Sequence, residues 1–140
     1  MRRYLSYRHK KYSKIEWKKA PDIKRTVKYL IKNLDMKHIN PSRIFCYRSF
    51  GAKTSASARI WGLPKIWQMT LIKKPSYIIE VISERYDGLA DDSKFEILLH
   101  ELAHIPNNFS GSLVPHYRKG KRNFRNKVKE LVVQYKKKSA

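Results

Sequence analysis

The rest of the sequence is organised around the stretch Leu98-Leu99-His100-Glu101-Leu102-Ala103-His104-Ile105-Pro106. It holds two histidines four residues apart, with a glutamate directly after the first. On an α-helix, residues at this spacing lie on the same face, so both rings can aim a nitrogen at one point, as a zinc ion requires. Glu101 lies beside this pair, within reach of a water on the metal. The motif therefore predicts two zinc ligands and a general base; two solvated or core-packed histidines on an ordinary amphipathic helix are the alternative.

The residues around the motif predict a buried helix. Five apolar side chains recur at spacings of three and four and form one inward face: Phe95, Leu98, Leu99, Leu102 and Ala103. Ser93 with Glu96 can form a capping box, or Asp91 or Asp92 can cap a helix that starts slightly earlier. Pro106 ends the helix, because the residue before a proline disfavours the α region.

A third ligand is expected downstream of Pro106. That part of the chain holds one histidine, His116, one glutamate, Glu130, and no aspartate or cysteine. Glu130 lies beside lysines in an amphipathic segment, where an exposed charge pair is its expected role. We therefore predict a three-histidine site with His116 as the third ligand and water in the open position; a surface histidine in a basic segment is the alternative. Asn107 and Ser110 stand where metzincins need Gly and His, which excludes that pattern.

Length and composition predict one soluble domain. The 140 residues suffice for a single modest core. The formal net charge of +21, from 32 Lys and Arg against 11 Asp and Glu, favours polyanionic partners such as nucleic acid. A single cysteine, Cys46, excludes an intramolecular disulfide, suits a reducing compartment and is expected to be buried and inert. Because no signal peptide or membrane-length apolar run is recognisable, the expected location is the cytoplasm.

Positive charge is concentrated at the two ends of the chain, whereas seven of the 11 acids fall between positions 80 and 101. Residues 1–20 are expected to be a basic, tyrosine-rich arm in front of a single domain over 21–140. The cations expected to bind DNA are Arg2, Arg3, Arg8, Lys119, Lys121, Arg122 and Arg125. The alternatives are an arm that packs its tyrosines on the domain and a solvated, lysine-rich surface.

The remaining pattern predicts an α+β fold. The expected elements are a helix that begins at residue 21 and ends near 35–40, a helix over 122–138, strands over 44–47, 58–63 and 77–83, a loop over 51–57, and a strand or short helix over 66–72. Trp61 and Trp67 are expected in the core. The strand over 77–83 precedes the metal helix, and in a peptidase such a strand can offer its edge to an extended peptide.

Three stretches resemble the metallopeptidase family found in archaea and phages: Ala58-Arg59-Ile60-Trp61-Gly62-Leu63-Pro64, His100 to Pro106, and Ser110-Gly111-Ser112-Leu113-Val114-Pro115-His116. The order of elements also resembles the minimal zincin architecture of SprT-like metallopeptidases. These resemblances imply a zincin-like α+β fold with a small, mostly antiparallel sheet. They also imply one Zn²⁺ on His100, His104 and His116, with Glu101 as base. The wider SprT-like resemblance further implies, by analogy, proteolysis of proteins on DNA.

These features favour hydrolysis of a protein or peptide substrate by a zinc-bound water that Glu101 activates. Tyr117 or Arg118, next to the third ligand, is expected to stabilise the oxyanion. Two other classes stay open: a metal-dependent hydrolase that acts on nucleic acid, and a non-enzymatic basic DNA-binding protein with a structural zinc. The glutamate argues against the first class, and the small number of cysteines and histidines argues against the second.

Overall fold

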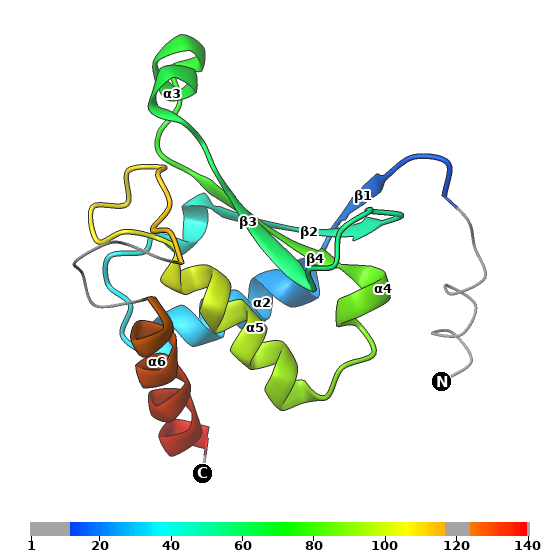
Figure 1. Cartoon of the computed structure of the whole chain (residues 1–140). Coiled ribbons are helices and arrows are strands. Elements are labelled where there is room, and N and C mark those ends of the chain that lie inside the picture. Colours follow the sequence, from blue (N-terminus) through cyan, green and yellow to red (C-terminus); the bar gives the residue numbers. More distant parts are fainter. Residues whose placement is uncertain (1–11, 117–123, 140) are drawn as a thin grey trace.

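The computed structural model describes residues 12–116 and 124–139, and it has the α+β fold that the sequence predicts (Figure 1). The longer helices lie on one side of a small sheet, and a short helix projects beyond the strand ends. In chain order the elements are β1 (Glu16–Lys19), α2 (Pro21–Asn33), the 3-10 turn η1 (Pro41–Arg43), β2 (Ile44–Phe50), β3 (Ala58–Gly62), α3 (Lys65–Leu71), β4 (Tyr77–Ile82), α4 (Ser83–Tyr86), α5 (Asp91–Ala103) and α6 (Phe124–Ser139).

In residues 12–116 and 124–139 the sheet has four strands, in the order β1-β2-β4-β3. The pairs β1–β2 and β3–β4 are antiparallel and the central pair β2–β4 is parallel, so the sheet is mixed and mostly antiparallel, as expected. The expectation that the strand before the metal helix offers a free edge is wrong, because β4 is paired on both sides. Strands β1 and β3 form the two edges of the described sheet instead.

Helix α2 begins where the sequence indicates. Pro21 occupies its first turn, where a missing N–H costs nothing, and the carboxylate of Asp22 lies at the positive end of the helix dipole. The apolar stripe of the helix is buried against the sheet: Ile23, Val27, Leu30 and Ile31.

The core lies between the inner face of the sheet and helices α2 and α5. Its largest fully buried side chains include Ile44 and Ile79 from the sheet, Leu30 from α2, and Leu98, Leu99 and Leu102 from α5. This packing fixes α5 against the sheet, so the part of α5 that carries the histidine motif is anchored on a rigid layer.

The start of α5 differs from the expected caps. The helix begins at Asp91 with Ala90 as its N-cap, and no side chain caps it. The capping box of Ser93 and Glu96 is therefore wrong, because Ser93 already lies inside the first turn. Both aspartates in that turn still favour the helix through its dipole.

Two tryptophans lie elsewhere than expected. Residues 65–71 form helix α3, which projects from the connection between β3 and β4 (Figure 1) and leaves Trp67 54% exposed. Trp61 occupies an outward position of β3 and is 49% exposed, so the prediction that both belong to the core is wrong. Cys46 is buried as expected, and burial raises the pKa of its thiol to about 11.

Residues 16–19 form a strand that pairs with β2, within the segment expected to be an arm. Helix α4, which connects β4 to the loop before α5, was not foreseen. None of the described helices is long and apolar enough to cross a membrane.

Candidate metal centre

Three histidine rings converge at the end of α5. His100 and His104 share one side of the helix, and His116 comes back to them at the far end of the following loop. The Nε2 atom of His116 lies 2.9 Å from Nε2 of His100 and 3.1 Å from Nε2 of His104. Among the described residues, these three form the group of histidine, cysteine and acidic side chains that could hold a metal ion. The structure thus brings together the three histidines that the sequence singled out.

Two hydrogen bonds join His104 to Val114, in the loop between α5 and His116. The backbone N–H of Val114 donates to the carbonyl of His104 at 2.7 Å, and the ring of His104 donates from Nδ1 to the carbonyl of Val114 at 2.5 Å. The second bond places the ring proton on Nδ1 and leaves the lone pair on Nε2 facing the other two rings. Such a bond on the far nitrogen is the usual way in which a protein orients a histidine ligand. The same two contacts bring His116, two residues later, towards α5.

A buried tyrosine holds the middle of this loop. The hydroxyl of Tyr77, from β4, accepts the backbone N–H of Gly111 at 2.8 Å and donates to the carbonyl of Ser112 at 2.8 Å. Its ring lies 5.0 Å from the ring of Phe109. Sequence reasoning missed this role, because Tyr77 appears there only as the first residue of a strand.

A glutamine adds a second anchor. The side-chain amide of Gln68, the buried residue of α3, donates to the carbonyls of Leu63 and Ser110 at 2.7 and 2.8 Å. The loop and the end of β3 also approach very closely at two glycines. Gly111 has φ +95°, and a Cβ atom on Gly62 would lie 2.0 Å from the carbonyl oxygen of Gly111. These glycines are needed for the close approach.

The chemistry of the three rings fits a metal ion. Burial, with repulsion from the other two histidines, lowers the pKa of His100 to about 4, and burial also lowers the pKa of His104. Both rings are therefore neutral imidazoles at neutral pH, and a neutral imidazole can offer a nitrogen lone pair to a metal. Nitrogens on a tetrahedral zinc lie about 3.3 Å apart, close to the separations found here. The close approach of the three ring nitrogens therefore favours a metal ion at this point.

Glu101 is a buried carboxyl group beside this cluster. Burial raises its pKa to about 7. Together with His100 it lines a groove of about 750 Å³ between α5, α6 and the start of β3, whose first residue, Ala58, also contributes to the wall. A carboxyl group with a pKa near neutrality, facing a groove, has the properties of a general base.

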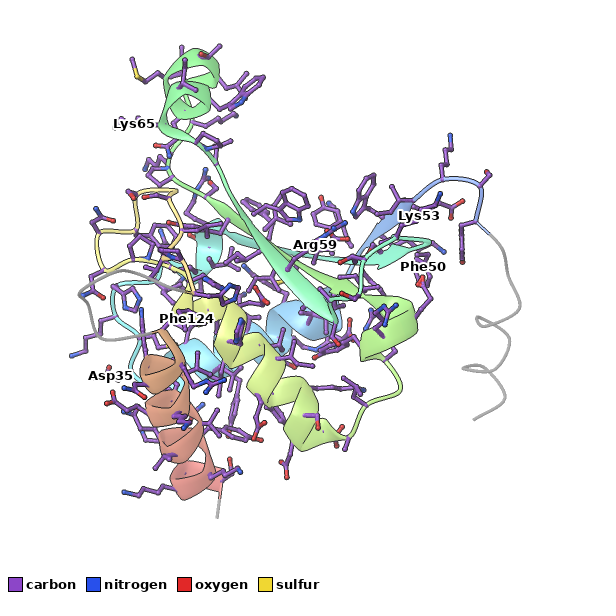
Figure 2. The ribbon with its side chains drawn as sticks, viewed as in Figure 1. Asp35, Phe50, Lys53, Arg59, Lys65 and Phe124 are labelled. Carbon is purple, nitrogen blue, oxygen red and sulfur yellow. The ribbon has the colours of Figure 1, made fainter. Side chains whose placement is uncertain are left out.

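Phe124 is a further residue at the site that the sequence did not single out. As the first residue of α6, it lies next to the end of α5 (Figure 2). Its ring stacks on His104 at 4.2 Å and meets His100 and His116 edge-on at 4.9 and 5.2 Å. The sequence indicates only that this phenylalanine belongs to the inner face of a basic helix. Its contact with all three imidazoles depends on how α6 packs.

Lys127 brings a positive charge close to the cluster. Its ammonium donates to the carbonyl of Ala103 at 2.9 Å, at the negative end of the α5 dipole. Burial is the main cause of the lowered pKa of His104, and the charge of Lys127 adds a smaller effect in the same direction. The expected oxyanion stabilisers, Tyr117 and Arg118, lie outside the described residues.

Most of the cations expected to bind DNA also lie outside the described residues: Arg2, Arg3, Arg8, Lys119, Lys121 and Arg122. Arg125 is described, and its side chain is exposed on α6.

Comparison with known proteins identifies a family for most of the chain. No curated protein and no solved structure matches the sequence. A family model described as "Putative phage metallopeptidase" matches residues 15–136, which include every strand, α2 to α5 and most of α6. Metallopeptidases carry a metal ion and cleave peptide bonds, and His100, His104 and His116 could hold such an ion. With a match over this length, the chain belongs to the family of phage metallopeptidases.

Proposed function

We propose that the protein is a zinc-dependent peptidase whose metal is held by His100, His104 and His116. The observation that carries this proposal is the convergence of three imidazole nitrogens next to a buried carboxyl group, that of Glu101, on a groove wall. Three histidines leave the fourth position of a tetrahedral zinc open for water, which is the ligand count of a catalytic site. A nuclease with two metals would need several carboxylates, and no such group accompanies the histidines among the described residues.

The chain contributes orientation and proton transfer. A zinc ion bound there would supply Lewis acidity and make the attacking water more acidic. Glu101 takes the proton of that water and passes it to the leaving amine. The bond from His104 to the Val114 carbonyl holds the ring with Nε2 free for the metal. The candidates for stabilising charge on the scissile carbonyl oxygen are Tyr117, Arg118 and Lys127.

The edge of the sheet suits an extended peptide. Within the described part of the chain, β3 is paired on one side only, and Ser57 and Ala58 at its start line the same groove as His100 and Glu101. A peptide that adds to this edge by backbone hydrogen bonds would run along the groove past the site. We therefore propose that β3, and not the strand over 77–83, offers its edge to the peptide substrate.

The substrates we propose are proteins associated with nucleic acid inside the cell. Support comes from the net charge of +21, which favours polyanions, and from the SprT-like resemblance, which is an analogy.

The direct test compares wild type with Glu101→Gln, which keeps the size of the side chain and removes the base. Both proteins are loaded with zinc, checked for equal metal content, and incubated with casein and with a labelled peptide library. We expect wild type to cleave the peptides and the variant to cleave them at least 100-fold more slowly. Equal cleavage by both proteins would refute the role of Glu101. Cleavage of labelled RNA, in place of peptide, would refute the peptidase.

A further inference from the structure

The outer face of the sheet, which turns away from α2 and α5, carries aromatic side chains where a solvated sheet usually carries polar ones. Its aromatic residues are Trp17 on β1, Phe45 and Tyr47 on β2, and Trp61 on β3. Trp17, Phe45 and Trp61 are 54%, 44% and 49% exposed. No described helix covers this side in Figure 1. Exposed rings gathered on one surface indicate a binding site.

The register of the strands places these rings in order. Phe45, Ile78 and Trp61 form one row across β2, β4 and β3. Lys19, Tyr47, Glu80 and Arg59 form the next row, and Trp17 lies one row further, opposite Ser49. Rows are roughly 6.7 Å apart and strands roughly 4.8 Å apart, so the diagonal from Trp17 over Tyr47 to Trp61 spans roughly 20 Å. That diagonal is long enough for several nucleotides.

A buried carboxylate, that of Glu80, orients two side chains on the β3 side of this surface. Glu80 is 1% exposed although it points to the outer face. It accepts from Nε of Arg59 at 2.8 Å and from the indole N–H of Trp61 at 2.9 Å. The guanidinium of Arg59 lies 5.1 Å from the Trp61 ring centre. One side chain therefore orients both a cation and a ring, which lowers the entropy lost on binding. Figure 2 labels Arg59 in this part of the sheet.

The charges on this face favour an anionic partner. The guanidinium of Arg43 lies 5.9 Å from the ring centre of Phe45 and donates to the carbonyls of Lys74 and Pro75. Lys19 is exposed in the middle row. The acidic group of that row, Glu80, is paired with Arg59. Trp17, Tyr47 and Trp61, with Ile78 and Glu80, line a groove of about 490 Å³ on this face.

We propose that the outer face of the sheet binds single-stranded nucleic acid, with unpaired bases stacked on Trp17 and Trp61 and phosphates held by Lys19, Arg43 and Arg59. Flat rings with cations beside them are the common elements of single-strand sites, because every base has a face that can stack. The surface lies on the opposite side of β3 from the groove of Glu101, so a bound strand leaves that groove open. It is independent of the peptidase activity, and it would hold the enzyme beside proteins on exposed strands.

The test measures fluorescence anisotropy of a labelled single strand of roughly 15 thymidines, with a duplex of equal length for comparison. We expect Trp17→Ala and Trp61→Ala each to weaken binding about 10-fold, the value of one stacked base. Trp61→Phe should keep most of the affinity, because it keeps a ring. Trp67→Ala is the matched control, since Trp67 is equally exposed but lies on α3, outside the four strands. Thermal unfolding checks that each variant is folded.

Three results would overturn the proposal. Equal affinity of wild type and the two alanine variants would mean that positive charge alone binds the strand, without stacking on either tryptophan. Equal affinity for the duplex would exclude stacking. A dimer of the wild type that the alanine variants abolish in sedimentation would assign the face to a second copy of the chain. Glu101→Gln should bind the strand like wild type, so loss of peptidase activity and loss of strand binding are separate outcomes.

Discussion

The substitution Tyr77→Phe should weaken metal binding, although Tyr77 lies outside the proposed ligand set. The change keeps the ring that packs on Phe109 and removes the hydroxyl that joins the Gly111 N–H to the Ser112 carbonyl. Each lost hydrogen bond costs about 1 kcal/mol, and the buried N–H of Gly111 is left without its acceptor. We therefore expect a loss of about 2 kcal/mol from the docked form of the loop.

This loss should appear in the zinc affinity, because the same loop delivers His116. If the docked loop is needed for the third ligand, about 2 kcal/mol corresponds to roughly 30-fold weaker binding. The assay is competition for zinc against a chromophoric chelator at neutral pH. Tyr29→Phe on α2 is the matched control, since that side chain is 45% exposed and far along the chain from the loop. Wild-type zinc affinity in Tyr77→Phe would refute the view that these contacts hold the ligand in place.

Three further predictions concern the packing around the site. Gly62→Ala should lower both the melting temperature and the zinc affinity, because its Cβ would lie 2.0 Å from the carbonyl oxygen of Gly111; unchanged melting curves with and without zinc would contradict this. Cys46 should react with a thiol reagent far more slowly in the native than in the denatured protein, because it is buried with a pKa raised to about 11; equal rates would show that it is accessible. The hydrogen bond from Arg48 lowers the pKa of Asp22, so the ionised Asp22 should stabilise the fold fully above its unfolded-state pKa and lose this contribution as the pH falls through its lowered folded-state pKa. Urea unfolding between roughly pH 6 and pH 3 should therefore show a free energy of unfolding that falls with pH, and Arg48→Met should make that fall smaller.

The elements that carry the site could be predicted because their patterns are local. The spacing of apolar residues indicated α2 and α5 within a few residues of their observed bounds, and the β-branched run indicated β4. The pairing of His100 with His104 follows from the period of the helix alone. His116 was found by elimination, since the chain beyond Pro106 offers one other candidate.

The contacts that hold the site could not be predicted, because they join elements far apart in the chain. Nothing near Tyr77 in the sequence indicates that its hydroxyl meets a loop 34 residues later. Phe124 has the spacing of an ordinary apolar helix residue, and only the packing of α6 on α5 places its ring against the histidines. Both roles depend on tertiary packing and leave no local pattern.

The prediction that Trp61 and Trp67 belong to the core is wrong for a related reason. Tryptophans are usually buried, and the sequence gives no sign that these two are exceptions. The register of β3 decides which side of the sheet Trp61 occupies, and the projection of α3 leaves Trp67 outside the core. Both depend on which strands are neighbours, and that order is not visible in the sequence.

Whether the three histidines hold one zinc ion can be measured as the zinc content of the purified protein after dialysis. Mass spectrometry of the intact native protein should give one zinc per chain for wild type and for His38→Ala, whose histidine is not part of the cluster. His116→Ala should retain well below one zinc, since its loss leaves two ligands on α5. A full equivalent of zinc in His116→Ala, or none in wild type supplied with zinc, would contradict the three-histidine centre.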